Sequence, residues 1–528
     1  MLRDAGEIAD GAVLSGDVCI VGAGAAGITI ARALRTSGLD VLLLESGRFE
    51  PDDETTALLE GENVGQPLDG SNRLNLDAVR LRYFGGTTNH WAGWCKPLLA
   101  ADLDARADVG RPGWPIAYDE LARWYPEAHQ ICGVGPFESA WSWWESNAGA
   151  PPALFADGAF TTTAVQISSR PRFGVTFRAD LVDAPRITVC ASANVRRVAL
   201  ASDGSHVDRL DVVTLSGRRF TARARAYVLA TGGIEVPRLL LASNDVHSAG
   251  VGNGHDLVGR YFSEHLRLAG GYIALAPGVD RTAFFNANHY RVADTNGDKL
   301  DLDVLAVITP SAELQRSRGL LAFDIGPIIE VFPMDASSLP QKRRPDVADV
   351  AELAGVIEGK TYASKMAIRI FAEQAGDRDS RVSLAADRDA LGMPRAQLDW
   401  RISRVDRESI VRGLGVLATE LGRRQLGRVR LVFEGESPAS LDPAALDRLD
   451  FGAECAFHHM GTTRMHSDAT HGVVDANCRV HDVANLYVAG CAVFPSAATA
   501  TPTMTLVALA LRLAAHLRAS LDRGADLR

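Results

Sequence analysis

The chain has 528 residues, of which 47% are hydrophobic and 23% are charged, and its formal net charge at pH 7 is −10. This composition is typical of a globular protein with a large core, and the negative charge argues against nucleic acid or an anionic membrane surface as the main partner. The seven cysteines form no C-x-x-C pair, no basic and apolar leader opens the chain, and no uninterrupted apolar run reaches about 18 residues. We therefore expect a cytoplasmic protein with no metal site and no membrane span.

The first elements form a βαβ pattern around a glycine-rich turn. Val18–Val21 reads as a strand, residues 28–37 as a helix and Val41–Leu44 as a second strand that ends at Glu45. The turn between the first strand and the helix, Gly22-Ala23-Gly24-Ala25-Ala26-Gly27, fits G-x-G-x-x-G. This pattern in this context predicts a dinucleotide site.

Each part of that motif has a physical reason. The first glycine permits the tight turn, the second lets a pyrophosphate approach the backbone, and the third lets the helix pack on the strand. The Glu45 carboxylate is placed to accept hydrogen bonds from an adenosine ribose, and it would repel the 2′-phosphate of NADP. The motif alone does not separate FAD from NAD.

The rest of the chain alternates helical and strand-like patterns. The expected elements are a helix at 113–132, strands within 187–230 that end in the buried run Tyr227–Gly233, strands in 270–335 and 365–400, a helix at 403–421, a strand at 485–488 and a helix at 503–521. We expect an α/β fold, α+β overall, in which a Rossmann-like cofactor domain is built from residues 1–265 and 452–528. The strand-rich segment 266–451 is expected to be an inserted substrate domain.

Two later segments favour FAD as the dinucleotide. Tyr227–Gly233 (YVLATGG) resembles the second strand that contacts the cofactor in flavoproteins with two dinucleotide-binding domains. Leu486–Gly490 (LYVAG) resembles the segment that touches the pyrophosphate and ribityl chain in the same proteins. FAD is long and needs contacts from several distant segments, whereas NAD in a simple dehydrogenase usually does not need the end of the chain.

Five separated segments together resemble the glucose-methanol-choline (GMC) oxidoreductases. They are the N-terminal fingerprint with Glu45, Phe84–Trp91 (FGGTTNHW), Val258–Arg260 with Glu264-His265, His458–Met465 (HHMGTTRM) and the tail from Gly472 to Thr505. The Asn-His-Trp form of the second glycine turn is most similar to the sugar-oxidising bacterial branch and to pyranose oxidases.

The resemblance implies a GMC fold with FAD bound by residues from all these segments. The implied cofactor-binding residues are Gly22, Gly24, Ala25, Ala26, Gly27, Glu45, Ser46, Gly86, Thr87, Asn89, His90, Trp91, Val195, Ala230, Thr231, Gly232, Ala489, Gly490, Pro502 and Thr503. His90 matches the residue that carries a covalent flavin link in pyranose oxidases, and many relatives lack the link, so both readings of His90 stay open. The N-terminus of the helix near Thr503 is expected to point at the N1/O2 edge of the flavin, where its dipole stabilises negative charge.

The resemblance also assigns the catalytic residues. His458 matches the histidine of H-x-x-G-T, which faces the flavin and accepts the hydroxyl proton while hydride moves to flavin N5, and imidazole suits that role near neutral pH. His459 is interpreted as a neighbour. The family usually places a second His or Asn before a Pro-Thr turn, where this chain has Thr501. A threonine hydroxyl orients a substrate by one hydrogen bond but is no base at neutral pH.

We therefore predict an FAD-dependent oxidoreductase of the EC 1.1 class that oxidises CH–OH to a carbonyl on a sugar, aminosugar or related polyol. The expected partners are that small-molecule alcohol and oxygen or another electron acceptor, with no nucleic acid. Two alternatives stay open: an NAD-dependent dehydrogenase, and a flavin-binding protein without alcohol-oxidising turnover. The choice between oxidase and dehydrogenase also stays open.

Overall fold

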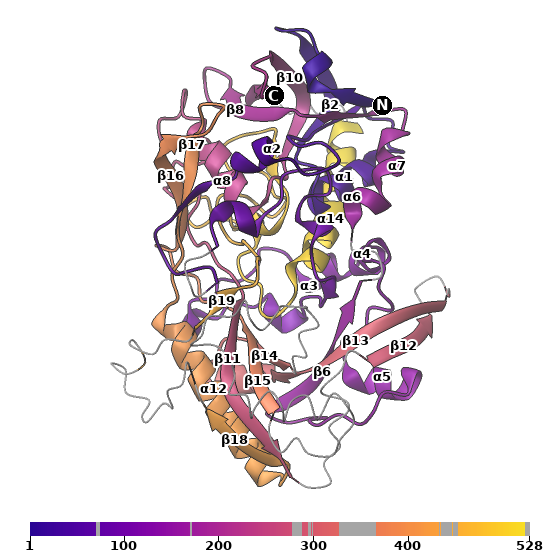
Figure 1. The fold of residues 1–528 in the computed structure, drawn as a ribbon, viewed down its shortest axis with the longest axis vertical. Helices are drawn as coiled ribbons and strands as arrows, with labels where there is room; N and C mark the ends of the chain where they lie inside the picture. Colours follow the sequence, from indigo (N-terminus) through magenta and orange to yellow (C-terminus); the bar gives the residue numbers. More distant parts are fainter. Residues whose placement is uncertain are drawn as a thin grey trace.

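The computed structural model describes residues 1–69, 74–168, 172–276, 288–293, 297, 299–326, 366–431, 433, 446 and 452–522. The molecule is elongated, with one sheet and its helices at one end and a second sheet at the other (Figure 1). The predicted mixed α/β fold is confirmed.

The first sheet is built around parallel strands of buried apolar residues. Its core strands pair in parallel. β9 lies between β10 and β8 and pairs with both in the antiparallel sense. Strands buried on both faces, such as Val41–Leu44, are typical of a parallel sheet covered by helices. The strand order is β1 (Leu2–Asp4), β7 (Ile187–Ala191), β3 (Val41–Leu44), β2 (Val13–Val21), β10 (Arg219–Leu229), β9 (Val207–Val213) and β8 (Asn194–Leu200), and β20 (Leu486–Val488) also pairs with β10.

Three helices cover this sheet: α1 (Ala25–Leu34), α8 (Gly232–Ala242) and α14 (Pro502–Asp522). α14 packs against α1 although the two are distant in sequence. By length and composition α14 is apolar enough to cross a membrane, but 78% of its apolar window is buried inside the protein. That burial is the pattern of a core helix.

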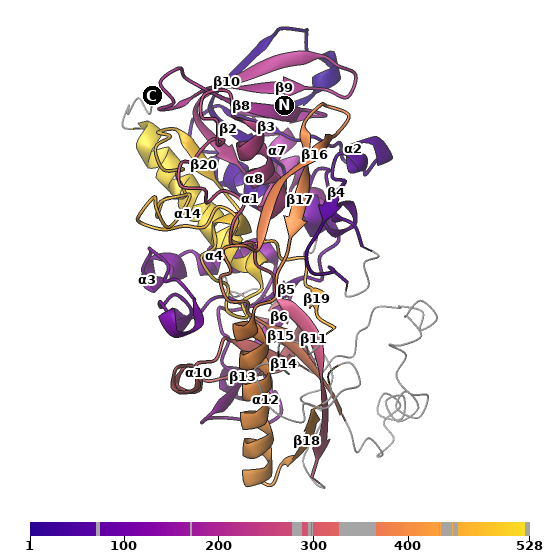
Figure 2. The same cartoon turned by 90° about the vertical axis from the view of Figure 1, so that its left-hand side faces the viewer.

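The second sheet is antiparallel throughout its described pairs. α12 (Arg404–Arg423) runs along one face of it, as Figure 2 shows, and Gly413 lets the helix approach because a Cβ there would lie 2.3 Å from the Phe323 ring. The strand order is β18 (Gly427–Leu431), β11 (Leu266–Leu275), β15 (Met366–Ala372), β14 (Phe323–Gly326), β13 (Lys299–Pro310), β6 (Phe160–Ile167) and β5 (Trp94–Cys95), with β12 (Asn288–Ala293) on β13 and β19 (Glu454–Cys455) on β11.

A small third sheet and several short helices complete the described chain. The sheet has the order β16 (Arg381–Arg388), β17 (Pro394–Asp399) and β4 (Gly61–Asn63). The short α-helices are α2 (Asp53–Ala57), α3 (Tyr118–Ala122), α4 (Tyr125–Cys132), α5 (Trp141–Ala148), α6 (Phe173–Thr176), α7 (Arg178–Val182) and α10 (Ala312–Arg318).

The structure differs from one expected helix and leaves the expected domain boundaries open. The single helix expected at 113–132 is wrong: α3 ends at Ala122 and α4 begins at Tyr125 with Pro126 in its first turn. Proline lacks an N–H and clashes with the carbonyl four residues earlier, so it is disfavoured inside a helix but tolerated in the first turn, where Pro126 lies. The division at residues 265 and 452 stays a prediction. The second sheet takes β5 and β6 from before residue 266, and part of 266–451 lies outside the described residues.

Candidate active site

The three glycines of the first turn have three different environments. Gly22 has φ of 100°, and a Cβ there would lie 2.7 Å from the Ala230 carbonyl oxygen. A Cβ on Gly27 would lie 1.9 Å from the Gly22 oxygen, so this glycine lets α1 pack closely. A Cβ on Gly24 would meet no atom within 4 Å. The first and third glycines therefore serve the fold, whereas Gly24 faces open space.

Glu45 joins this turn to the end of β3. Its side chain is buried, and its carboxylate accepts hydrogen bonds from the N–H groups of Ala23 (2.7 Å) and Gly47 (2.9 Å) and from the Ser46 hydroxyl (3.2 Å). These donors hold the carboxylate beside the glycine turn. The structure thus brings the predicted acidic residue to the predicted dinucleotide turn.

The second glycine turn lies directly against the first. A Cβ on Gly86 would lie 3.2 Å from the Gly24 Cα, and the Gly85 N–H donates to the Ala23 carbonyl at 2.8 Å. Of the other residues predicted in this turn, Thr87 and His90 are exposed. Asn89 is buried and donates its amide to the Phe84 carbonyl at 2.9 Å, and Trp91 packs edge-on against Phe173.

The other predicted cofactor residues gather at the same edge of the first sheet. Apart from Val195, they follow the carboxyl ends of β10 and β20, which run parallel to each other and to β2. Gly232 and Gly490 have φ of 85° and 118°, and a Cβ on either would meet nothing within 4 Å. Among the described residues, the buried Thr231 Oγ1 has no hydrogen-bond partner. The backbone N–H of Ala230 donates to the Val21 carbonyl, and that of Ala489 donates to the Leu229 carbonyl, so both residues extend the pairing of the sheet. Val195 lies buried on β8.

Open space over glycines and an unpaired hydroxyl along one sheet edge fit a long dinucleotide that several segments contact. Parallel sheets bind such ligands outside the carboxyl ends of their strands. The residues present therefore fit FAD.

His458 lies after β19 in a pocket of aromatic rings. Its Nδ1 lies 3.0 Å from Nδ1 of His265, and its ring is edge-on to Phe371. Its backbone N–H donates to the Glu264 carboxylate at 2.9 Å. Burial, with a further contribution from His265, lowers the pKa of His458 well below its ordinary value. The imidazole is therefore neutral at neutral pH.

His459 has a different set of neighbours. Its ring lies beside Phe262, and its Nε2 is 3.6 Å from Oε1 of Glu264. Burial lowers the pKa of His459 to about 3 and raises that of Glu264 to about 8. The two adjacent histidines thus occupy separate environments, and His459 faces the buried carboxyl group.

Thr501 lies immediately before α14, which begins at Pro502, with Thr503 in the first turn. The Thr501 hydroxyl is buried and accepts the backbone N–H of Lys96 at 2.8 Å. The Lys96 ammonium lies 2.6 Å from Asp324 and 2.8 Å from the Thr499 hydroxyl. One lysine therefore fixes both threonines of the loop before α14.

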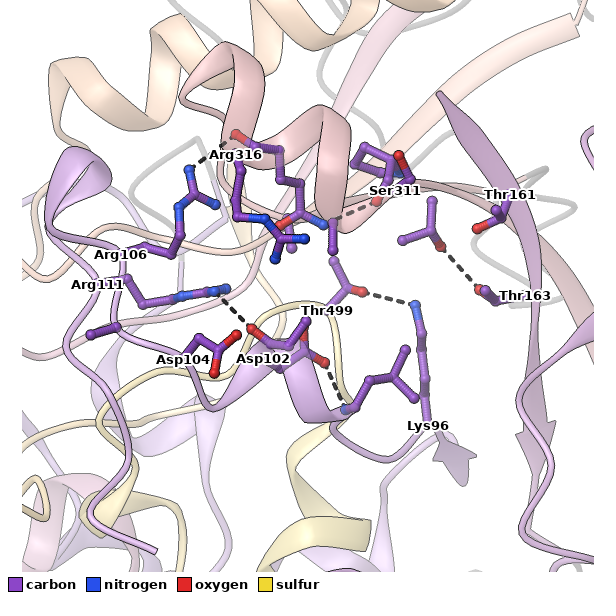
Figure 3. Close-up of a pocket in the computed structure, with 18 residues that line it drawn as sticks. Lys96, Asp102, Asp104, Arg106, Arg111, Thr161, Thr163, Ser311, Arg316 and Thr499 are labelled. Atoms are coloured by element: carbon purple, nitrogen blue, oxygen red, sulfur yellow. Dashed lines mark hydrogen bonds between the residues drawn. The ribbon is translucent and has the colours of Figure 1, made fainter. Parts of the chain in front are cut away.

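A cavity of about 450 Å³ reaches this loop, as Figure 3 shows. Asp104 and Arg316 in its lining are exposed, whereas Lys96 and Thr499 are buried, so the cavity runs inward from the surface. Its polar lining also includes Arg106, Arg111, Thr161, Thr163, Thr309 and Ser311.

The cavity and His458 lie along one face of the second sheet. Asp324, which holds Lys96, is paired directly with Phe371 across β14 and β15, so their side chains share a face. Phe371 in turn contacts His458. The lining of the cavity does not include His458; the two are linked through Lys96, Asp324 and Phe371.

Sequence reasoning missed several residues of this site. The sequence pattern places His265 in a motif but indicates no role for it, and it does not mark Lys96, Asp324 or Glu373 as site residues. Glu373 accepts the N–H of Ala498 at 3.2 Å and lies 3.6 Å from Arg111. The available signal was a charge within an apolar strand, as in Phe323-Asp324-Ile325.

Comparison with known families agrees with this geometry. Residues 17–249 match the family model described as FAD dependent oxidoreductase, and residues 376–510 match the one described as GMC oxidoreductase. These matches confirm FAD over the nicotinamide alternative.

Curated relatives match nearly the whole chain. The fructose dehydrogenase large subunit of Gluconobacter japonicus is 24% identical over 97% of this chain and 99% of that protein. The 2-methyl-1,2-propanediol dehydrogenase of Mycolicibacterium austroafricanum is 22% identical over 94% of each chain. The 6'''-hydroxyparomomycin C oxidase of Streptomyces lividus is 25% identical over 97% of this chain and 93% of its own.

Solved structures share the fold. Pyridoxine 4-oxidase from Mesorbium loti superposes with a TM-score of 0.54 at 21% identity, covering 95% of this chain and 98% of that one. Formate oxidase of Aspergillus oryzae RIB40 superposes with a TM-score of 0.59 at 16% identity, covering 98% and 100%. The two family matches and the curated relatives, taken together, show a GMC-type FAD-dependent oxidoreductase that acts on CH–OH donors.

Proposed function

We propose that this enzyme oxidises a hydroxyl of a sugar, aminosugar or related polyol to a carbonyl, with His458 as the base. The observation that carries the proposal is the position of His458: a partly buried, neutral imidazole that contacts Phe371, on the sheet face that Phe371 shares with Asp324. A neutral imidazole is the form that accepts a proton.

The lining of the cavity supports a polyhydroxylated substrate. Thr163 and Thr309 are hydrogen-bonded to each other at 3.0 Å, and arginine and aspartate side chains line other parts of the same cavity. Such groups donate to and accept from hydroxyls. The names of the relatives support the same class, since they include a fructose dehydrogenase, a hydroxyparomomycin oxidase and a propanediol dehydrogenase.

FAD, when bound, supplies the acceptor for the hydride that leaves the substrate carbon. The residues that would hold it are those at the sheet edge, chiefly Gly24, Glu45, Gly86 and Thr231. The first N–H groups of α14 lack intrahelical acceptors and form the positive end of the helix dipole, so this end of α14 favours negative charge.

Within the chain, His458 takes the hydroxyl proton, and the loop at Thr499–Thr501 supports the substrate side of the site. Lys96 already donates to Thr501 Oγ1, which leaves the threonine proton as the group that orients a substrate oxygen. Reoxidation by oxygen or another acceptor completes the proposed cycle, and a cytoplasmic location stays a prediction.

The test is anaerobic stopped-flow reduction of the flavin with a panel of sugars, aminosugars and polyols. General-base catalysis typically contributes about 10²–10⁴-fold, so His458→Ala should retain FAD and reduce it slower by about that factor. His459→Ala is the matched control and should lose less. Wild-type reduction rates in His458→Ala, or no reduction of the wild-type enzyme by any member of the panel, would contradict the proposal.

A further inference from the structure

We propose that His265 is a positioning residue that fixes the tautomer of His458, so that Nε2 of His458 is the atom that accepts the substrate proton. This inference rests on the proposed role of His458 as the base. It is carried by two ring contacts of His265 and by the chemistry of a carbonyl oxygen.

The first contact fixes one proton of His265. Its Nε2 lies 2.9 Å from the carbonyl oxygen of Ala498. A carbonyl oxygen only accepts hydrogen bonds, so Nε2 of His265 carries the hydrogen. The ring cannot easily turn over, because it is wholly buried and stacked on Phe371 with centroids 4.4 Å apart.

His265 carries no second proton. Burial lowers its pKa to about 3, and the nearby charge of Lys96 acts in the same direction. A neutral imidazole has one N–H and one lone pair. Since Nε2 holds the hydrogen, Nδ1 of His265 is an acceptor.

The second contact, between His265 and His458, determines which nitrogen of His458 carries the hydrogen. Nδ1 of His458 lies 3.0 Å from Nδ1 of His265, so the His458 atom must be the donor. The lone pair of neutral His458 is therefore on Nε2. No hydrogen-bond partner of that Nε2 occurs in the part of the chain that the structure describes.

The anchor at Ala498 is itself held on both sides. Its N–H donates to Glu373 while its carbonyl accepts from His265, and its φ of 46° is left-handed. A non-glycine residue persists in that region only where its surroundings over-determine it. The Ala498 carbonyl thus determines which nitrogen of His265 is protonated, and His265 in turn determines which nitrogen of His458 is protonated.

The effect on catalysis has a known scale. In the Ser-His-Asp triad, a partner that leaves the geometry intact but selects the wrong histidine tautomer lowers kcat by about 10⁴. Here an Nε2–H form of His458 would place a donor where the proton must be accepted. Loss of His265 should therefore slow flavin reduction without a matching change in substrate affinity.

Two substitutions of His265 separate positioning from packing. The amide of His265→Gln has an N–H₂ for Ala498 and an oxygen that accepts from His458, so it reproduces the donor and acceptor order. His265→Leu fills the space but does neither. His129→Leu is the control. His129 is another buried histidine, and its Nδ1 lies 2.9 Å from the carbonyl oxygen of Gly135.

The measurement is ¹⁵N NMR of the holoenzyme labelled on its histidine rings, with the His458 signals assigned by their loss in His458→Gln. We expect Nδ1 of His458 protonated and Nε2 unprotonated in the wild type and in His265→Gln, and the Nε2–H form populated in His265→Leu. Anaerobic flavin reduction should fall about 10–100-fold in His265→Leu, because the Nδ1–H of His458 loses its acceptor, remain within about threefold in His265→Gln, and stay at the wild-type rate in His129→Leu.

The NMR result stands apart from turnover. A wild-type His458 protonated on Nε2 would overturn the inference even if His458→Ala is slow and the proposed function holds. Equal rate losses in His265→Gln and His265→Leu would also overturn it. If no alcohol reduces the flavin, the proposed function fails, and the NMR spectrum still decides the tautomer.

Discussion

The Lys96 ammonium lies 2.6 Å from a carboxylate oxygen of Asp324, with side-chain exposures of only 4% and 6%. Removing one partner of such a buried pair leaves an uncompensated charge and typically costs about 3–5 kcal/mol. We expect Asp324→Asn to lower the melting temperature of the holoenzyme markedly. The Lys96→Met/Asp324→Leu double variant should be more stable than either single variant, because no unpaired charge remains. Additive losses, measured by thermal unfolding with flavin fluorescence, would contradict this coupling.

Gly24 should be needed for FAD but not for folding. A Cβ there meets nothing within 4 Å and its φ of −81° suits any residue, so Gly24→Val should fold but occupy the space of the pyrophosphate. We expect a colourless protein with wild-type circular dichroism. Gly254→Val, whose Cβ also meets nothing within 4 Å, is the control and should stay yellow. A normal flavin content in Gly24→Val would remove this turn from the site.

A covalent bond between His90 and FAD can be tested by acid precipitation. Its side chain is exposed at the end of the second glycine turn, beside residues that lie against Gly24. If His90 is bonded to FAD, acid precipitation leaves the yellow colour in the pellet, and His90→Ala releases it. Flavin in the wild-type supernatant would show that FAD is held without a covalent bond.

Glu264 should make stability fall with rising pH. Burial raises its folded-state pKa from the ordinary 4.5 to about 8, so the folded protein binds a proton that the unfolded chain loses above pH 4.5. Stability from this group is full below about pH 4.5 and is lost progressively up to about pH 8. Its facing groups are His459, Arg267 and the N–H groups of Ala456 and His458.

Glu264→Gln keeps the acceptor for those two N–H groups and removes the titration. The stability of this variant relative to the wild type should therefore increase with pH between about 4.5 and 8, by at most about 1.4 kcal/mol per pH unit. Holoenzyme melting temperatures across that range measure it. Parallel pH profiles of variant and wild type would exclude Glu264 as the source.

The sequence predicted the elements whose patterns are local. Val41–Leu44 is a strand as expected, and α12 and α14 lie within two residues of the helices expected at 403–421 and 503–521. α1 begins at Ala25 rather than at 28, because the helix starts directly after Gly24. The close packing at Gly27 could be stated in advance because it depends on Gly22 in the same turn, whereas the contact of Gly22 with Ala230 could not.

The contacts of the site could not be predicted in this way. His265 meets His458, and Lys96 meets Asp324 and Thr499, across long separations in sequence. Periodicity places a residue on a face of its own element but does not say which distant element covers that face. Family resemblance predicts His458 as the base, while its contact with His265 is found only in the coordinates.

The late position of β20 and α14 bears on how the protein is made. β20 pairs with β10, and α14 packs on α1, so a chain that emerges from the ribosome in order leaves one side of β10 and the outer face of α1 uncovered until the end of synthesis. The Gly490 and Thr501 segments of the cofactor edge arrive at the same moment. We therefore expect stable flavin binding to require the chain through α14, and a chain truncated before residue 486 to lose the coenzyme.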